Sequence, residues 1–195
     1  MRLCARDIPN LITIGRIGLS LPVGYLLLHE AYAAAMVLFL VAGVSDGLDG
    51  YLAKRYDWHS RLGSVLDPLA DKMLLVISFL ALTWVEVIPL WLLLLVLGRD
   101  VVIVAGAVAY HLLIGSYEMA PTWLSKTNTA FQIVLVLALV FANGVYMLPQ
   151  WLVLALLLVV CVTTIVSGLD YVRTWGQKAV RAMEASREAK QKDSP

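Results

Sequence analysis

The chain has 195 residues, of which 61% are hydrophobic, and its formal net charge is +1. A soluble domain of this length has too little interior to bury so much apolar surface, which excludes an ordinary water-soluble enzyme. A net charge this small gives no electrostatic basis for binding nucleic acid, so nucleic acid is not an expected partner. We therefore expect an all-α integral membrane protein.

Six apolar runs of membrane-crossing length follow one another along the chain. The first extends from Ile8 to Leu28, and the second from about Ala31 into the first of two aspartate pairs. The other four cover approximately residues 67–84, 90–110, 124–142 and 150–168. They predict a six-transmembrane-helix bundle within a membrane domain of residues 1–172, followed by a basic, partly disordered tail of residues 173–195.

The basic residues predict the orientation of this bundle. None of the fifteen Lys and Arg residues lies in the predicted turns at 29–30, 85–89 and 143–149. The positive-inside rule then places both termini and the loops at 54–62 and 111–123 in the cytoplasm. The N-terminal segment lacks the long Arg- and Ser-rich leader of a mitochondrial precursor, so we expect a bacterial cytoplasmic (inner) membrane.

Four aspartates beside the second and third runs form the main candidate site. Asp46 and Asp49 are three residues apart and Asp67 and Asp71 are four apart, so each pair shares one face of a helix. Two helices joined by a short polar loop would bring the pairs opposite one another at the cytoplasmic side. Unpaired carboxylates would repel each other there, and oxygen ligands of this kind suit Mg²⁺ or Mn²⁺ better than zinc.

Two other interpretations of the aspartates are open, namely separate salt bridges and the cation pathway of a channel or transporter. A pathway requires polar residues that continue toward the outer face of the membrane. The outer halves of the predicted spans, such as residues 74–82 and 134–139, are nearly all apolar. This pattern favours the metal site.

The pattern over residues 46–71 resembles the signature of the CDP-alcohol phosphotransferases. The matching residues are Asp46, Asp49, Gly50, Ala53, Gly63, Asp67 and Asp71, whereas Lys54, followed by Arg55, replaces the usual Arg. In this family a hydroxyl attacks the lipid-side phosphorus of a CDP-alcohol, and CMP leaves. The resemblance implies that all four aspartates hold metal and that Asp71 also accepts the hydroxyl proton. It further implies a homodimer, and nucleotide contacts by Asp46, Gly50, Lys54, Gly63 and Asp67.

Beyond the signature, the chain is similar over about residues 8–135 to the CMP-forming, mitochondrial-type cardiolipin synthases. The matching stretches are Ile8-Pro9-Asn10, Arg16-Ile17-Gly18, residues 66–72, Arg99-Asp100-Val101 and residues 125–129. The similarity implies that CDP-diacylglycerol donates its phosphatidyl group to phosphatidylglycerol, giving cardiolipin. The alternative is a phosphatidylglycerolphosphate synthase, which uses glycerol 3-phosphate. Those enzymes usually carry a second lysine at the position of Asn128, so this residue favours the less charged acceptor.

Four further residues are candidate ligands for phosphate or for the acceptor. Arg16 and Arg99 lie within apolar runs, and Lys126 and Asn128 lie near the start of the fifth run. The alternative roles are a structural ion pair for either arginine, and a reach to the membrane interface for Arg16 and Lys126. The adjacency of Asp100 to Arg99 does not by itself make the two residues partners, because neighbours on a helix point in different directions.

Overall fold

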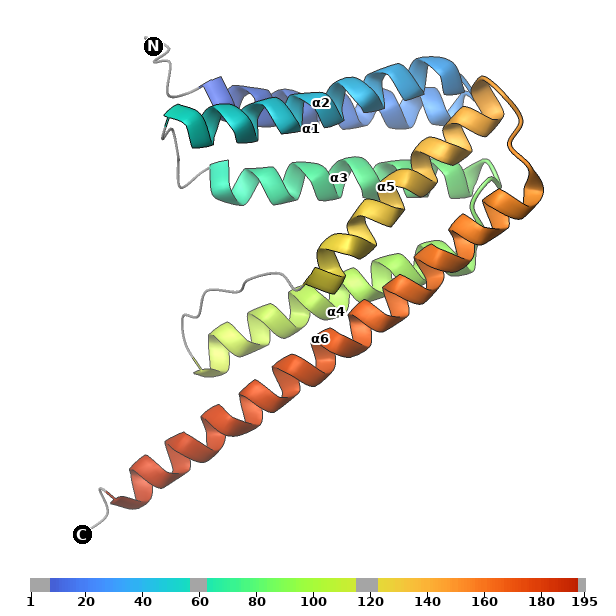
Figure 1. Ribbon diagram of the computed structural model, residues 1–195. Coiled ribbons are helices and arrows are strands. Elements are labelled where there is room, and N and C mark those ends of the chain that lie inside the picture. The colour runs from blue at the N-terminus through green and yellow to red at the C-terminus, as the bar shows by residue number, and fades with distance from the viewer. Residues whose placement is uncertain (1–7, 57–62, 115–122, 193–195) are drawn as a thin grey trace. The chain divides into compact units, whose positions relative to one another are not determined.

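The computed structural model describes residues 8–56, 63–114 and 123–192, and every regular element within these ranges is an α-helix (Figure 1). The six predicted helices are all present. Their bounds are α1 (Ile8–Leu28), α2 (Tyr32–Tyr56), α3 (Gly63–Trp84), α4 (Leu90–Ile114), α5 (Trp123–Gly144) and α6 (Gln150–Lys192).

Four helix ends differ from the prediction by more than two residues, in each case because the helix is longer. Helix α2 includes residues 54–56, and α4 includes residues 111–114, both of which were predicted as loop. Helix α3 begins at Gly63 rather than near residue 67, and α6 continues past Gly168 to Lys192. The prediction ended α2, α4 and α6 where their apolar runs ended or a loop was expected, but the segments that follow include strong helix formers such as Leu, Ala, Lys and Arg. The division into a membrane domain and a tail at residue 172 stays a prediction.

The packing of the chain defines two compact units. The first comprises residues 1–93 and 133–153, and the second comprises residues 94–132 and 154–195. Helices α4, α5 and α6 therefore each contribute to both units, whereas α1, α2 and α3 lie wholly in the first.

In the first unit, α1 packs against both α2 and α3. Val23, Leu27 and Leu82 are fully buried in this core. A glycine permits the close approach of α1 to α3, because a Cβ atom at Gly24 would lie only 2.5 Å from Cγ2 of Ile77. The tight packing of α1 against its two neighbours fixes where the side chains of α1 point.

Two helices end in the same backbone motif. Glu30 follows α1 with a φ of 56°, its N–H donates to the carbonyl of Leu27 at 3.1 Å, and the N–H of Ala31 donates to the carbonyl of Leu26 at 2.9 Å. This is a Schellman motif, which terminates a helix with one residue in the left-handed region. Glu86 has a φ of 60° and the same pair of hydrogen bonds after α3. Both motifs lie at predicted turns.

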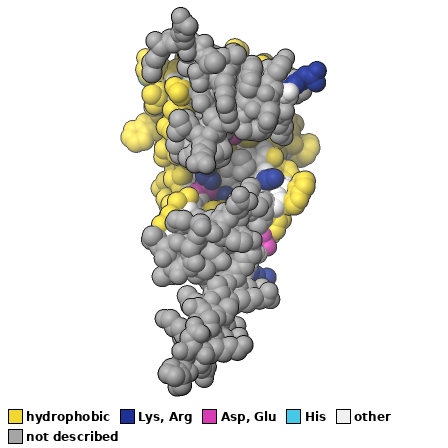
Figure 2. Space-filling view, turned by 90° about the vertical axis from the view of Figure 1, so that its left-hand side faces the viewer, with side chains coloured by type: hydrophobic (Ala, Val, Ile, Leu, Met, Phe, Trp, Pro, Cys, Tyr) yellow, Lys and Arg dark blue, Asp and Glu magenta, His cyan; other side chains and the backbone are white. Residues whose placement is uncertain are grey.

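Among the described residues, two helical segments are long and apolar enough to cross a membrane, namely Trp123–Gly144 and Gln150–Thr174. Shorter apolar segments cover Ile12–Leu28 and Tyr32–Leu48. Hydrophobic side chains also cover most of the coloured surface in Figure 2, where few charged groups are visible. An exposed apolar surface of this extent suits contact with lipid better than contact with water. The bundle of six membrane-spanning helices, with both termini in the cytoplasm, stays a prediction.

Candidate functional site

In the first unit, Arg16 contacts one aspartate from each predicted pair. Its side chain is only 1% exposed, and its Nη1 donates to Oδ1 of Asp46 on α2 and to Oδ1 of Asp71 on α3. These three residues come from three different helices and are far apart in the sequence. The structure therefore brings together one member of each aspartate pair, through a residue that was predicted separately as a phosphate ligand.

The charges around Arg16 are balanced locally. A guanidinium that is almost fully buried is costly unless it is paired with acids, and two carboxylates supply that pairing. The side chains of Asp46 and Asp71 are 43% and 46% exposed, so each carboxylate also has an accessible side. Because both oxygens accept from the same nitrogen, they lie close enough for one small cation to contact them together.

These two carboxylates fit a hard divalent cation, since oxygen ligands from two rigid helices suit Mg²⁺ or Mn²⁺. Arg16 already supplies positive charge to both carboxylates. Among the side chains that the structure describes, no group of three metal-ligating residues occurs. The side chains of Asp49, Lys54 and Asp67 and the surroundings of Gly50 and Gly63 lie outside the described part of the chain.

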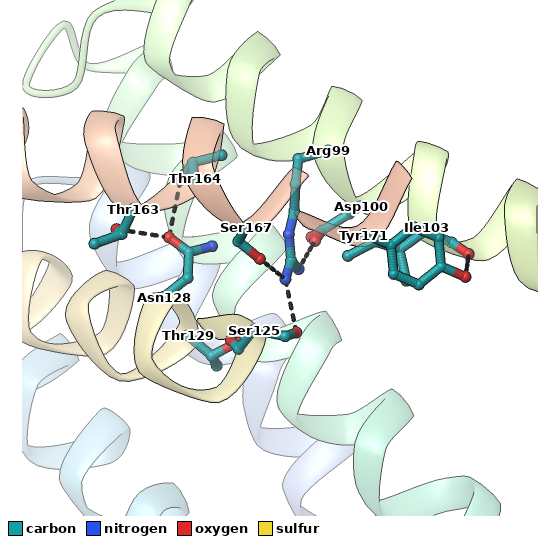
Figure 3. A network of polar contacts seen from close by, with 10 residues as sticks. All are labelled: Arg99, Asp100, Ile103, Ser125, Asn128, Thr129, Thr163, Thr164, Ser167 and Tyr171. Atoms are coloured by element: carbon teal, nitrogen blue, oxygen red, sulfur yellow. Dashed lines mark hydrogen bonds and ion pairs between the residues drawn. The ribbon is translucent and has the colours of Figure 1, made fainter. Parts of the chain in front are cut away.

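Arg99 is the centre of a second polar cluster, which lies in the second unit (Figure 3). Its side chain is buried, and its Nη2 donates to Oγ of Ser125 on α5 at 2.6 Å and to Oγ of Ser167 on α6 at 2.7 Å. Its Nη1 donates to Oδ1 of Asp100 at 2.8 Å. One guanidinium thus connects α4, α5 and α6.

Asp100 is thus a partner of Arg99, which their adjacency in the sequence did not by itself indicate. Adjacent Cα–Cβ bonds do diverge on a helix, but the arginine side chain is long enough to bring its guanidinium back to the neighbouring carboxylate. The ion pair is almost fully buried, and its two side chains are 5% and 11% exposed. The structural alternative for Arg99 is thus present in the structure. A phosphate would have to compete with three established partners.

The structure does not bring Lys126 and Asn128 together. Asn128 is fully buried, and its Oδ1 accepts hydrogen bonds from the hydroxyls of Thr163 at 2.9 Å and Thr164 at 3.0 Å on α6. Lys126 is exposed, and its Nζ lies 5.8 Å from the ring centroid of Trp123. Two residues correspond to a rotation of about 200° around a helix, so the two side chains leave α5 on opposite sides.

The sequence prediction missed the polar partners of these residues. Ser125, Ser167 and Thr163 were not singled out, nor was Tyr171, whose hydroxyl donates to the carbonyl of Ile103 at 2.9 Å. A signal was available, because polar residues recur at helical spacing along otherwise apolar segments of α5 and α6. Such residues are costly in an apolar environment unless they find partners on neighbouring helices.

Comparison with known proteins supplies the family context. The model of the family described as CDP-alcohol phosphatidyltransferase matches residues 6–186 of this chain. A rat protein named cardiolipin synthase (CMP-forming) is 35% identical over an alignment 199 residues long. The alignment covers 91% of this chain and 64% of the rat protein. The human protein of the same name is 34% identical with the same coverage. This chain thus spans somewhat less than two thirds of the length of these mammalian relatives.

A second kind of relative has a different printed activity. A Bacillus subtilis protein named CDP-diacylglycerol–glycerol-3-phosphate 3-phosphatidyltransferase is 31% identical over 182 residues. The match covers 85% of this chain and 93% of the Bacillus protein. The two groups of relatives share a family and differ in the acceptor that their names imply.

Proposed function

Because the chain belongs to the CDP-alcohol phosphatidyltransferase family, we propose that it moves the phosphatidyl group of CDP-diacylglycerol to phosphatidylglycerol, forming cardiolipin and CMP. The observation that carries the proposal is the convergence of Asp46 and Asp71 on Arg16, which places the two ends of the family signature at one point. The similarity to the two mammalian cardiolipin synthases supports the choice of acceptor.

The reaction is proposed to occur at the cytoplasmic boundary of a membrane. In this topology the six helices span the bilayer, the termini lie in the cytoplasm, and the turns at Glu30 and Glu86 lie outside. The absence of Lys and Arg from those turns and the two long apolar segments support this arrangement. A homodimer, expected from the family resemblance, belongs to the same proposal.

Asp46, Asp49, Asp67 and Asp71 would hold Mg²⁺ or Mn²⁺. Such an ion, when bound, neutralises charge on the diphosphate and on the departing CMP. Asp71 accepts the proton of the acceptor hydroxyl. At the same time the hydroxyl oxygen bonds to the lipid-side phosphorus, and the bond from that phosphorus to the CMP oxygen breaks. Arg16, beside these carboxylates, donates to phosphate oxygens. Gly50, Lys54 and Gly63 contribute to nucleotide binding.

The acceptor is proposed to lie against the residues of the second cluster. Arg99 supplies positive charge to its phosphodiester, and the neutral amide of Asn128 supplies a hydrogen-bond donor without further charge. Lys126 lies on the opposite side of α5 from Asn128, so its role is to attract anionic headgroups rather than to share a ligand with Asn128. This donor set suits the single negative charge of phosphatidylglycerol.

One observation favours a second candidate function. The similarity to the Bacillus protein covers 93% of that protein, and its name specifies glycerol 3-phosphate as the acceptor. The same aspartates and the same release of CMP would serve that reaction. The two functions therefore differ only in the acceptor.

The test is to incubate the purified protein with CDP-diacylglycerol, Mg²⁺ and each acceptor separately, and to identify the lipid product by mass spectrometry. We expect cardiolipin and CMP from phosphatidylglycerol, and no product when a chelator is added. Phosphatidylglycerophosphate formed from glycerol 3-phosphate, without cardiolipin, would contradict the proposed acceptor. Full activity in the chelator would contradict the metal assignment.

A further inference from the structure

Helix α5 has a row of polar side chains along one side. Ser125, Asn128 and Gln132 are spaced by three and four residues, which places them above one another on the same face of the helix. Asn128 is fully buried and Gln132 is only 4% exposed, although the rest of the helix is largely apolar. Ser125 contacts Arg99, and Asn128 contacts α6. Gln132 belongs neither to the family signature nor to the cluster around Arg99, so its burial has no explanation from either.

The buried polar atoms of this region include more hydrogen-bond donors than acceptors without a partner. Three buried nitrogens of the second unit, Arg99 Nε, Asn128 Nδ2 and Gln132 Nε2, have no hydrogen-bond partner among the residues that the structure describes. All three are donors, and in the described part of this unit no buried side-chain oxygen lacks a partner. Each unpaired buried donor costs about 1–3 kcal/mol. The chemistry that would complete the cluster is therefore a set of acceptor oxygens.

The donors of Asn128 and Gln132 are spread along the axis of α5 rather than gathered around one point. In Figure 3 the amide nitrogen of Asn128 points away from Thr163 and Thr164, whose hydroxyls contact its oxygen. Gln132 lies one helical turn beyond Asn128, and about 10 Å separates it from Ser125 along the axis of α5. In the proposed topology α5 begins at the cytoplasmic boundary, so Gln132 lies at the level of the outermost acyl carbons or glycerol esters of a lipid.

We propose that Gln132 donates a hydrogen bond from Nε2 to an acyl-ester carbonyl of the diacylated acceptor, while Asn128 donates to its phosphodiester. The inference rests on the proposed function and adds to it a residue that recognises the glycerol ester. Phosphatidylglycerol has oxygens at both depths. Glycerol 3-phosphate has no acyl ester, so Gln132 distinguishes a lipid acceptor from the soluble one.

The experiment compares ester and ether lipids in the purified, metal-loaded protein. Diether phosphatidylglycerol keeps the phosphodiester and lacks the carbonyls. We expect it to raise the KM of the wild-type protein about 3–10-fold over the diester, which corresponds to one net hydrogen bond. Gln132→Met, which keeps the length of the side chain and removes the donor, should raise the KM for the diester by the same factor and leave the diether unchanged.

Two controls identify the source of the effect. Replacing the diester donor lipid with diether CDP-diacylglycerol should leave the comparison between wild type and Gln132→Met unchanged, because the contact is to the acceptor. Asn143→Leu serves as the matched variant, since Asn143 lies on the same helix and its Nδ2 already donates to the carbonyl of Leu139 at 2.8 Å. This variant should retain the ester preference of the wild type.

Each outcome supports the inference or overturns it. Use of phosphatidylglycerol with equal KM values for the diester and the diether in the wild type would overturn the role of Gln132 alone, and this measurement needs no variant. An ester preference that persists in Gln132→Met, or that follows the donor lipid, would do the same. A wild-type protein that makes no cardiolipin and uses only glycerol 3-phosphate would overturn both the inference and the proposed function.

Discussion

At the scale of single residues, Arg16 and the proposed metal would compete for the same oxygens. The Nη1 of Arg16 contacts Asp46 and Asp71, and both are proposed metal ligands. Arg16→Gln removes a positive charge next to the site and leaves a shorter, neutral polar side chain. We expect the dissociation constant for Mn²⁺ to fall at least about fivefold, because a like charge at close range disfavours the ion by at least about 1 kcal/mol.

Electron paramagnetic resonance of free Mn²⁺ during a titration of the purified protein measures this change directly. Turnover should fall in the same variant, since Arg16 is also proposed to donate to phosphate. Arg99→Gln is the control, because its charge belongs to the second cluster. An unchanged affinity for Mn²⁺ in Arg16→Gln would show that Asp46 and Asp71 do not share a metal.

Asp71 is proposed to have a second role, as the acceptor of the hydroxyl proton. Asp71→Asn keeps the shape of the side chain and removes its capacity to accept that proton. We expect turnover to fall by about 10²–10⁴-fold, the usual contribution of a positioned base, while the KM for CDP-diacylglycerol changes little. Steady-state kinetics with saturating Mg²⁺ provide the measurement. Wild-type turnover in this variant would mean that another group removes the proton.

At the scale of helices, one close approach between two helices depends on a glycine, Gly144 at the end of α5. A Cβ atom at Gly144 would lie 2.7 Å from Cβ of Tyr32 and 2.8 Å from the backbone nitrogen of Ala33, so α5 ends directly against the start of α2. The backbone of α2 cannot move aside as a flexible side chain can. We therefore expect Gly144→Ala to destabilise the protein by about 1–3 kcal/mol, as overpacking does in other cores.

Gly98, within α4, provides the matched comparison. Nothing lies within 4 Å of a Cβ atom placed there. Gly98→Ala should raise stability by about 0.5–1 kcal/mol, because alanine loses less backbone entropy than glycine on forming a helix. Thermal unfolding of both variants in the same detergent measures the difference. Equal midpoints would contradict the close contact between α5 and α2.

The predictability of the structure also differs between scales. Six helices could be predicted because apolar runs are local properties of the chain. Helix ends were less predictable, since a helix such as α6 continues through polar residues that favour it. The pairing of Arg16 with Asp46 and Asp71 could not be predicted, because it depends on how three helices pack. The separation of Lys126 from Asn128 was predictable from their spacing, which places them on opposite sides of any helix.

At the scale of the whole molecule, most of the buried charged and amide side chains among the described residues belong to two clusters, one within each unit. Each cluster contains a buried arginine that connects three helices, Arg16 in the first and Arg99 in the second. The first cluster contains two carboxylates beside its arginine, and the second unit contains three buried donors without partners among the described residues.

The choice of acceptor should therefore depend on the charge of the second cluster. Asn128 is fully buried and its amide oxygen accepts from two neutral hydroxyls, so Asn128→Lys places a positive charge next to neutral partners. Burial of an unpaired charge is costly. We expect this variant to unfold at a lower temperature than the wild type, and we expect glycerol 3-phosphate, with nearly two negative charges, to restore much of the loss.

The kinetic consequence follows from the same charge. With CDP-diacylglycerol saturating, Asn128→Lys should raise kcat/KM for glycerol 3-phosphate and lower it for phosphatidylglycerol, changing their ratio by about tenfold or more, the effect of one charge-assisted hydrogen bond. Asn128→Met, which is uncharged, should lower the use of phosphatidylglycerol without improving the use of glycerol 3-phosphate. An unchanged ratio in the lysine variant would exclude Asn128 from the choice of acceptor. A wild-type preference for glycerol 3-phosphate would overturn the cardiolipin assignment, while the proposed carboxylate site and the release of CMP would stand.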